Sequence, residues 1–201
     1  MANLLTSLRL MLVVPAAMAF ARSEFISPTL LLALMSVAIA TDFFDGIVAR
    51  RTNALTPRGQ LFDHVTDFLF VTCGLAGAAI AGQVTAALPL LIAVAFSQYV
   101  LDSYFLHREK RLRMSFLGRW NGMLYFVPLV LIAVSRLGFM GSAAQGFSSL
   151  IVLLSYLLLL STIASIIDRA AAPRRAHPLS DSPSTYGITE KSSRRGEPTL
   201  S

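Results

Sequence analysis

The chain has 201 residues, of which 55% are hydrophobic and 14% charged, and its mean hydropathy is +0.64. Soluble domains carry about 25% charged residues, so the composition excludes an ordinary soluble domain and predicts an integral membrane protein. The formal net charge of +6 could suit nucleic acid. However, the basic residues cluster beside apolar segments, which indicates loops next to anionic lipid and no nucleic-acid partner.

Apolar segments follow one another along most of the chain, and a membrane helix needs roughly 20 residues. We expect an all-α protein with six transmembrane helices, at residues 3–21, 29–51, 59–81, 85–106, 118–134 and 147–167. The first segment lacks the basic start of a signal peptide, so we expect it to be retained. Its polar residues Asn3, Thr6 and Arg9 are spaced three apart and would share a helix face that points into the bundle. Alternatively, Arg9 extends to the water interface.

The basic residues also predict the orientation. Loops on one side would carry most of them, including Arg50, Arg58 and the run from Arg108 to Arg119, whereas the other side holds only Arg22 and Arg136. The positive-inside rule therefore predicts cytoplasmic N and C termini. Composition shifts to Pro, Ser, Arg and Gly after residue 168, so we expect a membrane domain at 1–168 and a disordered cytoplasmic tail at 169–201.

Four carboxylates lie at the facing ends of the second and third segments. Asp42 and Asp45 are three apart, and Asp63 and Asp67 are four apart, so each pair shares a helix face. Because the connecting loop is short, we expect the two segments to form a helical hairpin in which both pairs converge. Ionisable residues in spanning segments are costly and usually functional.

Clustered carboxylates repel one another, and divalent cations relieve that repulsion. Oxygen ligands without cysteine or suitably spaced histidine favour Mg²⁺ or Mn²⁺. Four acids suit two ions about 3.5–4 Å apart that flank a phosphoryl group. His64 turns about 100° away from Asp63 on a helix, so we expect it to serve packing or an interface.

The pattern Asp42-x2-Asp45-Gly46-x2-Ala49-Arg50-x8-Gly59-x3-Asp63-x3-Asp67 resembles in full the signature of the CDP-alcohol phosphatidyltransferases. The opening Asn3-x2-Thr6-x2-Arg9 is similar to the start of that family. The resemblance implies a homodimeric enzyme in the inner membrane of a bacterium, with its site facing the cytoplasm. It would transfer a phosphatidyl group from a CDP-linked donor, CDP-diacylglycerol by family habit, to a small alcohol, releasing CMP.

The same resemblance implies the roles of individual residues. Two Mg²⁺ or Mn²⁺ ions would be bound by Asp42, Asp45, Asp63 and Asp67, with Asp67 also acting as the general base. The cytidine nucleotide would lie against Asn3, Asp45, Gly46, Ala49, Arg50 and Gly59. For Arg50, an interfacial cation that binds no phosphate is the alternative.

The closest broad type is phosphatidylglycerophosphate synthase, but the acceptor region departs from it. Such synthases commonly read Asp-Pro-x-Ala-Asp-Lys where this chain reads Asp63-His-Val-Thr-Asp67-Phe68, and Gly-Lys-x-Lys-Thr where it reads Gly118-Arg-Trp-Asn-Gly122. Glycerol 3-phosphate therefore remains one possible acceptor. Four arginines could bind an acceptor phosphate or could equally be topogenic charge: Arg108, Arg111, Arg113 and Arg119.

A carboxylate-lined cation transporter is the rival from another functional class, because intramembrane acids also line ion pathways. Acids for conduction should be spread through the membrane depth on several helices. Here they are confined to one end of two neighbouring segments, beside Gly46 and Ala49. The pattern therefore favours the enzyme.

Overall fold

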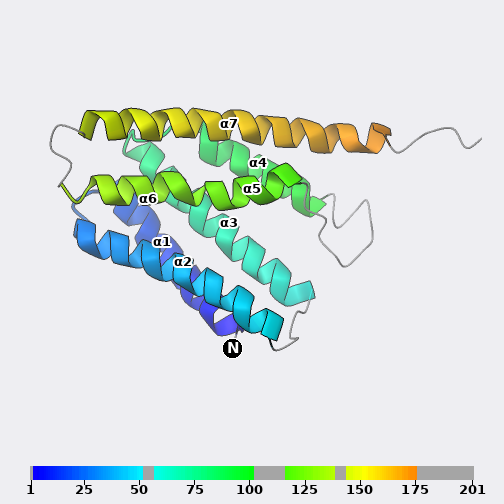
Figure 1. Cartoon of the computed structure of the whole chain (residues 1–201), viewed down its shortest axis with the longest axis horizontal. Helices are drawn as coiled ribbons and strands as arrows, with labels where there is room; N and C mark the ends of the chain where they lie inside the picture. The colour runs from blue at the N-terminus through cyan, green and yellow to red at the C-terminus, as the bar shows by residue number, and fades with distance from the viewer. Residues whose placement is uncertain (1, 52–56, 102–115, 139–143, 176–201) are drawn as a thin grey trace, which may run out of the picture.

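The computed structural model describes residues 2–51, 57–101, 116–138 and 144–175, and within these ranges it is all-helical. The helices are α1 (Ala2–Ala21), α2 (Pro28–Arg51), α3 (Pro57–Ile80), α4 (Ala87–Leu101), α5 (Phe116–Leu124), α6 (Phe126–Ser135) and α7 (Ala144–Arg175). They form an elongated bundle in which α7 runs along one side, next to α4, α5 and α6, while α1, α2 and α3 make up the other side (Figure 1).

The predicted segments correspond to these helices, with two differences. The fifth segment is interrupted at Tyr125, between α5 and α6. Pro128 explains the interruption, because a proline lacks the backbone N–H and its ring clashes with the carbonyl four residues earlier, here that of Leu124. The last helix is also longer than expected, since α7 continues through residues 169–175, where we had placed the start of the tail. Residues 176–201 lie outside the described part.

Two helices of the described part are long and apolar enough to cross a membrane, at Leu61–Ile80 and Gln145–Asp168. Four shorter apolar helices accompany them, at Thr6–Ala21, Pro28–Phe44, Ala87–Leu101 and Trp120–Ser135. Many large apolar side chains on these helices are exposed, among them Met11, Leu90 and Leu160. Such an apolar surface suits a lipid environment.

The second and third helices do not pack along each other in the described ranges. α1 packs extensively along α3 and also along α2, whereas α2 and α3 make at most marginal contact within the described ranges. The N-terminal helix therefore lies between the two acid-bearing helices. The short α2–α3 loop requires only that their ends be near each other, and α1 fills the space that opens between them.

Close approach of α1 and α3 depends on small residues. A Cβ atom added at Gly77 would collide with the backbone carbonyl oxygen of Ala17 on α1. One turn earlier on α3, a Cβ at Gly74 would lie 3.1 Å from a methyl group of Leu129. Small residues at such crossings let helix backbones approach closely inside a membrane.

Arg136 joins three parts of the bundle at the end opposite the acids. Its guanidinium donates hydrogen bonds to the carbonyl oxygens of Ala19 (2.5 Å) and Phe20 (2.8 Å) at the C-terminal end of α1, and to the side-chain oxygen of Gln83 (3.1 Å). The last carbonyls of a helix have no partner within it and carry the negative end of the helix dipole. Arg136 therefore caps α1.

We expect Gly77→Ala to reduce the stability of the folded protein by about 1–3 kcal/mol, because the added methyl group forces α1 and α3 apart. Thermal unfolding of the detergent-solubilised protein measures the loss. Gly146→Ala is the matched control, since a Cβ there meets nothing within 4 Å. Equal melting temperatures for Gly77→Ala and wild type would contradict the close packing described above.

Candidate functional site

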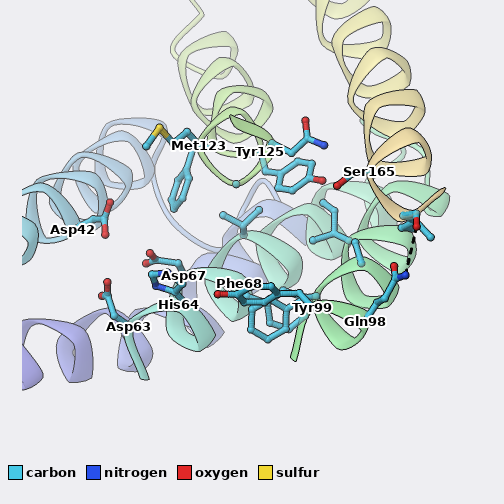
Figure 2. A pocket seen from close by; sticks show the side chains of 18 of the residues that line it. Asp42, Asp63, His64, Asp67, Phe68, Gln98, Tyr99, Met123, Tyr125 and Ser165 are labelled. Carbon is cyan, nitrogen blue, oxygen red and sulfur yellow. Dashed lines mark hydrogen bonds between the residues drawn. The ribbon is translucent and has the colours of Figure 1, made fainter. Parts of the chain in front are cut away.

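Three aspartates from two helices converge at one end of the bundle. Asp42 comes from α2, and Asp63 and Asp67 come from successive turns of α3. One carboxylate oxygen from each lies within 4.8 Å of the corresponding oxygens of the other two, and Figure 2 shows the three side chains directed toward a common space. The convergence predicted from the sequence is therefore present for these three residues.

A buried arginine accompanies the acids. Arg9 of α1 has a side chain that is 0% exposed, and its guanidinium lies 3.4 Å from Oδ1 of Asp42 and 3.4 Å from Oδ1 of Asp63. It also donates a hydrogen bond to Asp67. The sequence predicts that Arg9 lies on a face turned into the bundle or extends to the water interface, and its buried position agrees with the first alternative. The sequence did not identify the acids as partners of Arg9, although the polar spacing of the first helix was the available signal.

The three carboxylates line one end of a pocket of about 660 Å³ (Figure 2). Helices α2, α3, α4, α5, α6 and α7 all contribute to its wall. Its lining is largely apolar and includes Val71, Ile92 and the stacked rings of Phe68 and Phe96, whose centroids are 4.0 Å apart. The pocket thus joins a strongly polar end to an apolar interior.

His64 also lines this pocket. The sequence had placed it in packing or at an interface, because it points away from Asp63 on an ideal helix. In the structure the pocket is wide enough for residues at 63, 64 and 67 of α3 all to reach it (Figure 2). Its proximity to the acids could be predicted only with the neighbouring helices in place.

Polar side chains from the α5–α6 junction and α7 line or border the other end of the pocket. The hydroxyls of Tyr125 and Thr162 are 2.7 Å apart, and Ser161 donates a 2.7 Å hydrogen bond to Oδ1 of Asn121. Because the Thr162 hydroxyl donates to the carbonyl of Leu158 (2.6 Å), Tyr125 is the donor to Thr162. These bonds fix the interrupted helix against α7 and hold this wall in place.

Several residues predicted for the site lie outside what the structure describes. Six of them lie in helices, at positions whose side chains or surroundings the structure does not describe: Asn3, Asp45, Gly46, Ala49, Arg50 and Arg119. Residues 108, 111 and 113 lie in the undescribed range 102–115. Gly59 is described and lies in the first turn of α3. The structure therefore brings together three of the four predicted acids, and the placement of the other residues remains a prediction.

The donor set suits hard divalent cations. Among the described residues, the side chains whose ligand atoms lie close enough together to share a metal ion are three carboxylates, and Mg²⁺ and Mn²⁺ prefer carboxylate oxygens. The side chains of Asp42, Asp63 and Asp67 are 45%, 30% and 29% exposed, so they remain accessible from the pocket, although each contacts Arg9 with one oxygen. The residues present therefore fit a divalent cation.

Taken together, fold and site define a helical membrane protein whose pocket carries clustered carboxylates at one end and apolar side chains within. The family model described as CDP-alcohol phosphatidyltransferase matches residues 1–167, which is most of the chain. The chain belongs to the CDP-alcohol phosphatidyltransferase family.

Curated relatives match a shorter stretch. The chain is 37% identical over 71 residues to proteins of Rickettsia felis, Rickettsia typhi and Rickettsia prowazekii, each named CDP-diacylglycerol–glycerol-3-phosphate 3-phosphatidyltransferase. These matches cover 35% of this chain and 39–40% of the relatives. The chain thus spans about two fifths of the length of the curated relatives it matches.

Proposed function

We propose that this protein transfers a phosphatidyl group from CDP-diacylglycerol to a small alcohol and releases CMP, as a step of phospholipid synthesis. The observation that carries the proposal is the convergence of three aspartates from α2 and α3 at the mouth of a largely apolar pocket, in a chain that belongs to this family. Glycerol 3-phosphate is the proposed acceptor, because it is named for the three rickettsial relatives.

The acid cluster is proposed to bind two Mg²⁺ or Mn²⁺ ions through Asp42, Asp63 and Asp67, with Asp45 as the fourth ligand. When bound, these ions would neutralise charge on the diphosphate and on the departing CMP. Stabilisation of developing charge is usually the largest catalytic contribution. The three described carboxylates already face one space, which supports this assignment.

The remaining chemistry is assigned to residues of the chain. A carboxylate oxygen of Asp67 accepts the proton of the acceptor hydroxyl. The hydroxyl oxygen then bonds to the phosphorus that carries diacylglycerol, and the bond from that phosphorus to the bridging oxygen of CMP breaks.

Six positions are proposed to bind the nucleotide: Asn3, Asp45, Gly46, Ala49, Arg50 and Gly59. Four arginines are proposed to bind the acceptor phosphate: Arg108, Arg111, Arg113 and Arg119.

The fold supports a membrane location for this reaction. If α5 and α6 count as one interrupted span, the helices are compatible with six spans. The positive-inside rule, applied to the basic residues near the acid end, supports the proposal that this end and both termini face the cytoplasm. Soluble nucleotide would then reach the acids from the cytoplasm while acyl chains remain in the apolar environment. We further propose a membrane domain at 1–168, a cytoplasmic tail at 169–201, a homodimer and residence in a bacterial inner membrane.

The purified protein should release CMP from CDP-diacylglycerol when Mg²⁺ or Mn²⁺ and the correct alcohol are present, and addition of EDTA should stop the release. A panel of alcohols that includes glycerol 3-phosphate identifies the acceptor by lipid product. The rival function, cation transport, predicts metal flux into proteoliposomes without CMP release. Absence of CMP with every alcohol, under conditions in which a known family member is active, would contradict the proposal.

Asp67→Asn should lower turnover by at least about 10²-fold, because an amide cannot accept the proton. The variant should stay folded and still bind CDP-diacylglycerol, as measured by thermal unfolding and by donor binding. Glu24→Gln, in the exposed turn between α1 and α2, is the control and should retain wild-type turnover. Retained turnover in Asp67→Asn would exclude this residue as the base.

A further inference from the structure

Among the described residues, Arg9 is the cation that contacts the acid cluster. It belongs to α1, which lies between the two acid-bearing helices. From there its two terminal nitrogens contact Asp42 on one helix and Asp63 and Asp67 on the other. A single side chain therefore connects three helices.

The charges at this position do not balance. Three carboxylates and one guanidinium give a net charge of −2 (−3 + 1 = −2) if all are ionised. The guanidinium is fully buried, while the acids are each about one third to one half exposed on their pocket side. Arg9 therefore faces the cluster from the protein interior, and the opposite side of the cluster is open to the pocket.

Each contact uses only one oxygen, Oδ1, of each carboxylate. In these contacts Arg9 does not use the second oxygen of any of the three acids, and the side chains of Asp42 and Asp67 also hydrogen-bond each other. An arginine can satisfy several acceptors at once because its guanidinium has five N–H donors in a rigid plane. The geometry thus lets an internal cation and an incoming cation share the same carboxylates.

We propose that Arg9 is a resident counter-ion, a positioning residue that holds the three acids together without metal and moderates how tightly metal binds. This inference rests on the proposed metal-binding role of the cluster. Without Arg9, mutual repulsion of the acids would destabilise the metal-free fold. The same loss would strengthen binding of a divalent cation, because a positive charge next to the metal would be gone.

The test uses the full-length protein in detergent, freed of metal with EDTA, and Mn²⁺ alone as the probe. Electron paramagnetic resonance measures free Mn²⁺, and thermal unfolding with and without Mn²⁺ measures stability. Arg9→Met should lower the melting temperature of the metal-free protein, bind Mn²⁺ at least about fivefold more tightly than wild type, and gain more stability from Mn²⁺. Equal or weaker Mn²⁺ binding by Arg9→Met would overturn the proposal.

Arg136→Met is the matched control, since this arginine also contacts α1, but at the opposite end and through backbone carbonyls. It should lower the melting temperature and leave the affinity for Mn²⁺ unchanged. A purely structural role of Arg9 predicts the same result for both variants. Tightened Mn²⁺ binding is the readout that separates the two roles.

A second variant covers the case in which Arg9→Met does not fold without metal. The double variant Arg9→Met/Asp63→Asn returns the net charge of the described cluster to −2 (−2 + 0 = −2) and should recover part of the lost metal-free stability. If the double variant is no more stable than Arg9→Met, charge balance is not what Arg9 supplies, and the proposal fails. If the wild-type protein binds no Mn²⁺, the metal site of the proposed function is wrong. The melting temperatures of the metal-free proteins then decide the role of Arg9.

Discussion

A buried positive charge between two helices that carry aspartates is the interaction on which the candidate site depends. Removing an arginine from water is unfavourable by several kcal/mol unless it is paired and hydrogen-bonded, and the acids of α2 and α3 supply such partners where the two helices meet. Arg9 on α1 occupies that position with a side chain that is 0% exposed. The requirement to pair this charge therefore brings three helices together at one end of the bundle.

The rest of the bundle supports this arrangement. Gly77 allows α1 to lie directly against α3, and Arg136 fixes the other end of α1 by capping its carbonyls. On the far side of the pocket, Tyr125 and Thr162 join the interrupted helix to α7. The acids consequently lie at one end of a pocket whose opposite wall is fixed by hydrogen bonds and whose lining is largely apolar.

The sequence predicted the helical class and most helix bounds, because apolar runs of membrane length are a strong signal. It also predicted that acids of the second and third helices meet, since helix periodicity places Asp63 and Asp67 on one face. It did not predict that α1 lies between these helices, so that α2 and α3 meet at their acid-bearing ends without packing along each other. Helix order in space depends on side-chain packing across segments far apart in the chain, such as Ala17 against Gly77.

Local features with a distant partner were also missed. The helix break at Tyr125 has a local cause in Pro128. However, Tyr125 hydrogen-bonds to Thr162, which lies 37 residues later in the chain. The position of His64 beside the pocket depends on the width of a space formed by six helices. The pairing of Arg9 with the acids required the position of α1, although the polar face of the first helix already indicated that the arginine points inward.

The most direct test of the account is to locate bound metal. Crystals of the protein soaked in Mn²⁺ and measured at the manganese absorption edge should show anomalous density within bonding distance of Asp42, Asp63 and Asp67, at two neighbouring positions. The Arg9 guanidinium should lie behind these acids, on the side away from the pocket. Manganese density elsewhere, with these three carboxylates unliganded, would contradict the central claim.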